Sequence, residues 1–340
     1  MQQTTRLSLC VLSTALLLGD VRSAHAGDDT LFEQINNLHR DLTHPDPEVR
    51  TKAAWKVQNV IELVSRLDGH LKYALRDSDP RVRAHAAVSL GQLRPMYRAR
   101  EVVPDLVRAL KDKDIEVRVS AANALGRIGA VTKDVVPAIT AALKDTEPRV
   151  VEFAAIALRD IGPEAHTAVP TLITVLDSLQ RPAIREAAAL ALGSIGPDAK
   201  AAIPVLLDIL KRSKYTTLRE SVVSALSMIQ AEEHLVMPAL IDALKHDEHY
   251  GVRGRAARAL GDFGARAKAA VPSLIEALSA PSARTQGDAV FIQEAVLEAL
   301  GKIGPDAKSA LPAIAKLTAN PAIDQRVRSA AAQAAKAIQR

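Results

Sequence analysis

The chain has 340 residues, of which 48% are hydrophobic and only 3% are aromatic. This composition excludes an intrinsically disordered chain and argues against a core built from large side chains. Lys and Arg number 44 against 39 Asp and Glu, and the formal net charge of +5 is too small for this length to predict a nucleic-acid partner. The single cysteine, Cys10, leaves the rest of the chain without disulfides or thiolate chemistry.

The N-terminal segment predicts a secretory signal peptide. A basic residue precedes an apolar run over residues 7–18, and Ala24 and Ala26 provide the small side chains of a cleavage site. The run is shorter than the roughly 20 residues that span a bilayer as a helix. We therefore expect a signal peptide over residues 1–26 and a domain over residues 27–340. After cleavage near Ala26 the domain would be periplasmic or secreted, without a transmembrane segment; an uncleaved anchor is the alternative.

A helix over residues 30–42 is expected to open the domain. Thr30 and Glu33 form a capping box at its start. Apolar side chains then recur on one stripe of this helix, at Leu31, Ile35, Leu38 and Leu42.

A proline preceded by an apolar residue then recurs along the chain, at Pro104, Pro137, Pro170, Pro204, Pro238, Pro272 and Pro312. The spacings are 33, 33, 34, 34, 34 and 40 residues, a period typical of a stacked helical array. Each period predicts two short helices. The first begins near the proline and ends at an aspartate such as Asp112 or Asp145, because the fixed φ of proline suits a first helical turn. Residues 281–288 form a polar insertion that predicts a surface loop.

The second helix of each period begins at a capping residue before a proline, as at Asp46-Pro47, Asp79-Pro80 and Asn320-Pro321. It ends at glycines suited to a left-handed closing residue, namely Gly129, Gly162, Gly196, Gly264 and Gly304. We also expect the Leu-Gly glycines just before these positions to belong to helix ends. Helices this short are marginal alone, so stacking between neighbours must stabilise them.

One motif carries a resemblance to a known family. Residues 112–129 read D-x4-V-R-x2-A-A-x-A-L-G-x-I-G, which resembles the HEAT repeat, in particular the variety named after phycobilin lyases. The resemblance covers almost all of residues 30–340. It implies an all-α, right-handed α-solenoid, an armadillo-type superhelix of about nine HEAT-like helix pairs whose second helices lie on the concave side.

An arginine recurs at one position of most second helices, which we call the arginine slot: Arg50, Arg83, Arg118, Arg185, Arg219, Arg253 and Arg328. The fourth and eighth repeats carry Val151 and Gln293 there. We expect each arginine to pair with an inter-helix aspartate of its own or the next repeat, since bidentate arginine–carboxylate pairs suit such a turn. The alternative is a track for anions.

The position five residues after the slot is expected to face the concave side. This concave column consists of Trp55, Val88, Asn123, Ile156, Leu190, Ser224, Arg258, Glu298 and Gln333. Phe153 lies close to Ile156 on the same helix face. If exposed, the column forms an apolar patch that grades into a polar end, as partner-binding surfaces do, with Trp55 as the anchor. The alternative is that these residues pack between adjacent second helices.

A second column follows the slot by one residue and holds Glu152, Glu186, Glu220 and Glu294, which we interpret as solvated helix surface. No catalytic or cofactor motif occurs in the sequence, and adjacent side chains such as those from His246 to His249 rarely converge on a metal. We therefore expect no catalytic residue, cofactor or metal, and a non-catalytic exported scaffold or adaptor that binds a protein partner along its concave helix face. The alternative, implied by the resemblance, is a lyase-like or accessory enzyme subunit that handles a tetrapyrrole or other ligand.

Overall fold

The computed structural model describes residues 37–38, 40–58, 70–92, 99–130, 133–178, 180–279 and 285–340. The predicted signal peptide and the capping box of the first helix lie outside these residues. Within them the secondary structure is helical throughout, without a strand. The predicted all-α solenoid is therefore confirmed.

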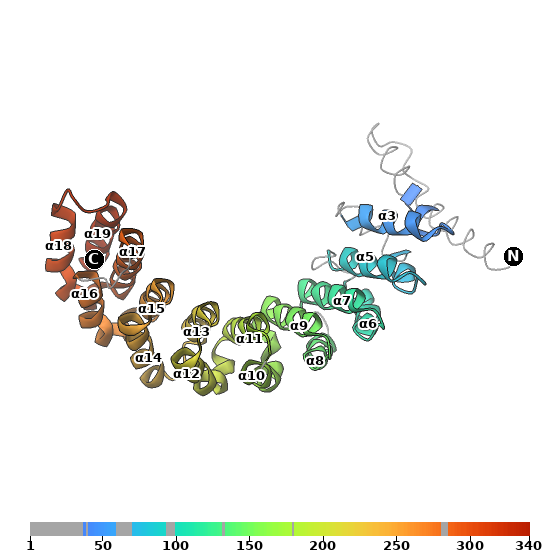
Figure 1. Cartoon of the computed structure of the whole chain (residues 1–340), viewed down its shortest axis with the longest axis horizontal. Coiled ribbons are helices and arrows are strands. Elements are labelled where there is room, and N and C mark those ends of the chain that lie inside the picture. Colours follow the sequence, from blue (N-terminus) through green and yellow to red (C-terminus); the bar gives the residue numbers. More distant parts are fainter. Residues whose placement is uncertain are drawn as a thin grey trace.

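The helices form an arc with two layers (Figure 1). Its inner layer consists of the second helices: α3 (Pro47–Gln58), α5 (Pro80–Leu90), α7 (Ile115–Ile128), α9 (Pro148–Ile161), α11 (Pro182–Ile195), α13 (Thr216–Ile229), α15 (Tyr250–Asp262), α17 (Gln286–Ile303) and α19 (Gln325–Ile338). The outer layer holds the first helices: α6 (Ala99–Ala109), α8 (Val135–Ala142), α10 (Val169–Asp177), α12 (Ile203–Arg212), α14 (Glu233–His246), α16 (Val271–Ser279) and α18 (Leu311–Ala319). The second helices lie on the concave side, as expected.

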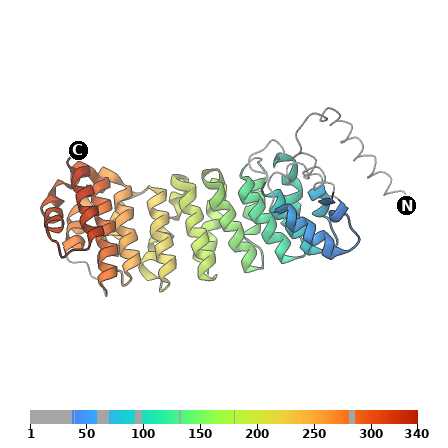
Figure 2. The ribbon, with the colours of Figure 1, turned by 90° about the horizontal axis from the view of Figure 1, so that it is seen from above.

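From α7 to α17, each second helix packs against the first helix of its own repeat and against the second helices before and after it. Seen from above, the helices consequently stand side by side along the length of the molecule (Figure 2). One core runs through all of these contacts. In α7, for example, Ala121, Ala122 and Leu125 are fully buried. Small side chains keep neighbouring helices close, because each repeat can bury its apolar stripe only against the next.

The Leu-Gly glycines have a different role from the one expected. Gly126 lies inside α7, and a Cβ atom at this position would lie 2.6 Å from the Cα atom of Ala157 on α9. Gly193 on α11 approaches Ala225 on α13 in the same way. These glycines therefore set the close packing of consecutive second helices and are not helix ends. By contrast, Gly129 has the predicted left-handed φ of 81°.

After four of the second helices the chain continues as short 3₁₀ helices, which the sequence pattern did not predict: η1 (Gly162–Ala168), η2 (Gly196–Ala202), η3 (Gly264–Ala270) and η4 (Gly304–Ala310). In η1, η2 and η4 the proline after the glycine occupies the first turn, where its missing N–H costs no helical hydrogen bond. The proline ends the α-helix and begins the next element.

Two first helices begin earlier than expected, since Pro104 and Pro238 lie inside α6 and α14 and not in their first turns. Two other predicted boundaries are also wrong. Helix α19 begins at Gln325, because Asp324 accepts the backbone N–H of Arg326 and caps the helix, whereas Asn320 forms a separate turn by accepting the N–H of Ala322. The expected loop over residues 281–288 also ends early: Thr285 caps α17 by accepting the N–H of Asp288, so the last three residues of that range are its first turn.

One described stretch, Pro182–Arg212, is long and apolar enough to cross a membrane by length and composition alone. It consists of α11, η2 and α12, which are separate elements of the array, and 50% of its most apolar window is buried inside the molecule.

Candidate functional site: the concave surface

The concave column lies on the stripe of the second helices that does not pack on the first helices. Its members are all partly or fully exposed. Trp55 on α3 is 55% exposed. Val88, Asn123 and Leu190 are partly exposed on α5, α7 and α11, and Glu298 on α17 is exposed. The structure therefore places these residues at the surface, on successive helices of the inner layer.

The middle of the column combines exposure with packing. Ile156 and Phe153 on α9 are partly exposed, yet both also contact the buried core. One further apolar side chain, Met228 on α13, is 46% exposed and lies one helical turn after Ser224. Met228 was missed at the level of sequence because the column takes one position per helix, although residues four apart share a helix face.

The C-terminal end of the column is polar and paired within the protein. The Nε atom of Arg258 lies 3.0 Å from a carboxylate oxygen of Glu298, and the guanidinium lies 4.8 Å from the ring centre of Phe291. Lys302 binds Glu298 at 2.7 Å and Asp262 at 3.0 Å. This network joins α15 to α17 and satisfies the charges that the sequence predicts at this end.

Four arginines of the slot bind an aspartate in the turn of the following repeat. The pairs are Arg50–Asp77, Arg83–Asp112, Arg118–Asp145 and Arg219–Asp247. In each pair Nε and Nη2 donate to the two carboxylate oxygens at 2.6–3.1 Å. The side chains are only 5–15% exposed, so solvent screens these bidentate pairs weakly. We call each pair a rung.

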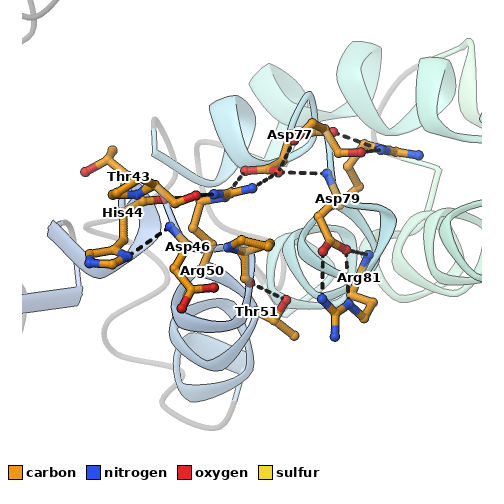
Figure 3. Close-up of polar contacts among 12 residues, drawn as sticks. Thr43, His44, Asp46, Arg50, Thr51, Asp77, Asp79 and Arg81 are labelled. Carbon is orange, nitrogen blue, oxygen red and sulfur yellow. Dashed lines mark hydrogen bonds and ion pairs between the residues drawn. The ribbon is translucent and has the colours of Figure 1, made fainter.

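Each rung also fixes the turn of its own repeat. Arg50 lies between its own turn and the next one (Figure 3), and its Nη1 donates to the backbone carbonyl of His44 at 2.8 Å. Arg83 donates to the carbonyl of Asp77 in the same way. The Oδ1 atom of Asp77 in turn accepts the backbone N–H of Asp79 at 2.9 Å, which shapes the turn. One arginine therefore couples two consecutive turns.

The predicted pairing does not extend to Arg185. Ser213 stands where its aspartate would be, and the Nε atom of Arg185 donates to the backbone carbonyl of Leu176 at 2.8 Å. In the fourth repeat both partners are replaced, since Val151 occupies the slot and Ser178 the turn position. The two serines still accept a backbone N–H two residues later, so the turns persist without the charged pair.

Two other slots use backbone acceptors. The Nε2 atom of Gln293 donates to the carbonyl of Leu278 at 3.2 Å, and Nη1 of Arg253 donates to the carbonyl of Asp247 at 2.5 Å. Arg328, in the last repeat, makes no side-chain hydrogen bond among the described residues. The slot is therefore a structural position in most repeats, and only four of its members form rungs in the part of the chain that the structure describes.

Ionisation of the rungs follows from burial and pairing. Burial raises the pKa of Asp112, but hydrogen bonds from Arg83 and from the N–H of Asp114 outweigh it and hold this pKa below its ordinary value of 3.8. The hydrogen bond to Asp112 raises the pKa of Arg83, against the opposing effect of burial. The rung is consequently ionised at neutral pH.

Exposed ion pairs join neighbouring second helices along the concave side. They are Arg81–Glu48, Arg149–Glu116, Arg255–Glu220, Arg258–Glu298 and Lys302–Asp262. They were not among the sequence-based expectations, although a signal exists: two residues before the slot, the first four repeats alternate Glu48, Arg81, Glu116 and Arg149. Such alternation predicts opposite charges on adjacent helices.

The side chains between His246 and His249 are engaged in the fold. Asp247 belongs to a rung, and Nδ1 of His249 accepts the backbone N–H of Gly251 at 3.1 Å. The ring of His249 stacks on that of Tyr250 at 4.8 Å. The segment therefore works as a turn and a helix cap, and its polar atoms do not converge on one point. Among the described residues, no group of three metal-ligating side chains occurs.

The repeat pattern and the fold match known proteins. The family model described as HEAT repeats matches residues 67–159, 136–227 and 237–336. An engineered protein of known crystal structure is similar to the chain at 22% identity and a TM-score of 0.54, over 95% of this chain and 93% of that one. Importin beta is similar at 17% identity and a TM-score of 0.61, over 92% of this chain and 47% of that protein, so the chain spans about half its length. No curated protein matches the chain.

Proposed function

Because the chain belongs to the HEAT-repeat family, we propose that it is a non-catalytic scaffold that binds a protein partner along its concave face. Solenoids of this kind commonly present a curved surface to other proteins. The proposal rests on the partly exposed apolar side chains of four inner helices, which are interrupted only by Asn123 on α7: Trp55, Val88, Ile156 and Leu190. Apolar surface of this extent, next to polar side chains, is typical of partner sites.

Affinity would come from many modest contacts spread over several repeats, with a few anchors contributing most. Trp55 is the strongest anchor by size and exposure. The concave side also keeps its shape on binding, because rungs or close glycine–alanine contacts fix most inner helices against the next. A preordered surface loses little conformational entropy when a partner binds.

The test is recovery of the partner from the native compartment by the purified protein. We expect Trp55→Ala combined with Leu190→Glu to reduce recovery strongly while the circular dichroism spectrum stays helical. The matched control is Tyr73→Ala combined with Leu235→Glu, which changes two exposed apolar residues on first helices. Undiminished recovery by the concave variant, or equal losses in both variants, would contradict the assignment.

The motif resemblance to phycobilin lyases supports a competing function, a lyase-like or accessory subunit that binds a tetrapyrrole. A visible absorbance band after incubation with a tetrapyrrole would favour that function, and we expect none.

We also propose that the chain is exported and cleaved after Ala26. N-terminal sequencing of the native protein should then start at Gly27, whereas a start at Met1 would contradict cleavage.

A further inference from the structure

The central repeats differ from their neighbours in whether the carboxylates of the concave side form ion pairs. On both sides of them, carboxylates are paired across the repeat boundary, as in Arg149–Glu116 and Arg255–Glu220. Glu152 on α9 and Glu186 on α11 are partly exposed and make no ion pair among the described residues. Glu186 only accepts a hydrogen bond from the hydroxyl group of Thr217, at 2.5 Å.

Each of these carboxylates lies beside apolar surface. Ile156 follows Glu152 by four residues, and Leu190 follows Glu186 by four, so each pair lies on one helix face a single turn apart. Phe153 adds apolar surface next to Glu152. The same two-part pattern, a carboxylate followed after one turn by an apolar side chain, therefore occurs on two consecutive inner helices.

No cation lies within ion-pair distance of either carboxylate among the described residues. Arg159 binds Asp160 at 2.9 Å, and Arg149, which interacts electrostatically with Glu152, forms its ion pair with Glu116. An occupant that covered Ile156 and Leu190 would remove water from Glu152 and Glu186 as well. Desolvating a carboxylate without a partner is costly, so the surface favours an occupant that supplies its own cations.

Helix spacing restricts the form of this occupant. Packed helices lie about 8–10 Å apart, and α9 and α11 pack directly against each other. A polyproline II segment has three residues per turn and rises about 9 Å per turn, so every third side chain falls over the next helix. A chain that runs along the arc in this conformation meets α9 and α11 with residues three apart.

We propose that α9 and α11 bind an extended segment of the partner protein with Lys or Arg at every third position and an apolar residue beside each. The cations pair with Glu152 and Glu186, and the apolar side chains lie on Ile156 and Leu190. This inference rests on the proposed scaffold function and names the chemistry of its partner.

The test uses a labelled synthetic peptide, (Lys-Leu-Pro)₅, and fluorescence anisotropy at low and high salt. We compare it with (Glu-Leu-Pro)₅ and with a peptide of the same composition in which the lysines are grouped. We expect only the periodic basic peptide to bind well, and its affinity to fall with salt because the ion pairs are exposed. The double variant Glu152→Gln with Glu186→Gln should weaken binding about tenfold, since each exposed pair contributes a factor of a few.

Two matched controls isolate the surface. Glu164→Gln with Asp198→Asn removes the same charge from exposed carboxylates in η1 and η2, and should leave affinity unchanged. Leu190→Ser should weaken binding, whereas Leu235→Ser on α14 should not. Equal binding of the grouped and periodic peptides, or equal effects of both charge variants, would overturn the inference, as would the absence of binding.

Failure of the inference is distinguishable from failure of the proposed function. If Trp55→Ala with Leu190→Glu abolishes partner recovery but Glu152→Gln with Glu186→Gln affects neither peptide nor partner, the concave face binds a partner of different chemistry. If neither double variant reduces partner recovery, the scaffold proposal itself fails.

Discussion

At the scale of single residues, the rung between Arg83 and Asp112 shows how one side chain can serve two repeats. Its guanidinium donates to a carboxylate of the next repeat and to a backbone carbonyl of its own, and it is 7% exposed. Loss of one partner would leave the other charge buried without compensation. This costs more free energy of folding than the intact pair contributes.

Replacing Asp112 by Asn should therefore destabilise the protein by about 2 kcal/mol at pH 7, because a charge-assisted hydrogen-bonded pair is lost. The pKa of Asp112 in the folded state lies below its ordinary value of 3.8. Its stabilisation is complete above that value and is lost as the pH falls through the lower folded pKa. The melting temperature of the wild type should fall in this acidic range, and that of Asp112→Asn should fall less. Asp208→Asn, which removes an exposed partner of Arg212, is the control and should change stability little.

The sequence could predict which arginines recur, because the period places them on one position of the second helix. It could not predict their partners, since the turn of the same repeat and the turn of the next repeat both carry an aspartate. Arg185 shows the limit most clearly: the substitution at its partner position, Ser213, lies 28 residues away in the sequence.

At the scale of helices, the junctions between repeats four and five and between repeats five and six lack rungs. Stacking there depends on apolar packing, such as the contact of Gly193 with Ala225, whereas the hydrogen bond from Arg185 to Leu176 stays within repeat five. The ends of η1 and η2 also fall at these junctions. The central part of the array is thus held together with fewer ionic contacts than its N-terminal part.

The substitution Ser213→Asp should restore a rung, because Arg185 already occupies the slot. We expect it to stabilise the protein by about 1 kcal/mol, as a charge-assisted hydrogen bond is gained while the turn is kept. Ser213→Asn is the matched control: its amide oxygen can still accept the N–H of Tyr215, but it carries no charge. Denaturant unfolding measures both. Equal stabilisation by Asp and Asn would show that the turn, and not the ion pair, is responsible.

Helix positions could be predicted from the period, as for the first helix expected near Pro204, which begins at Ile203. The 3₁₀ segments could not, because a Gly-Pro pair indicates the end of an α-helix without specifying the conformation of the next segment. The start of α19 was misplaced for a related reason: both Asn320 and Asp324 are capping residues, and only the three-dimensional path of the chain selects between them.

At the scale of the whole molecule, stacked pairs produce one continuous inner surface from α3 to α19 (Figure 1). The positions of its apolar column follow from the helical period, so the sequence could predict them. Their degree of exposure depends on how closely neighbouring helices pack, which the sequence pattern does not specify. The unpaired state of Glu152 and Glu186 likewise depends on which cations the neighbouring repeats supply.

The partly exposed apolar side chains Trp55, Val88, Ile156 and Leu190 lie on this inner surface, so partner binding is assigned to it.

Site-specific photocrosslinking in the native compartment tests this assignment most directly. A photoreactive amino acid is introduced either at Leu190, on the inner face, or at Leu235, on the outer layer, and the crosslinked products are identified by mass spectrometry. We expect one partner to be crosslinked repeatedly from Leu190 and not from Leu235. Crosslinks that form only from Leu235, or equally from both positions, would contradict a scaffold that binds through its concave face.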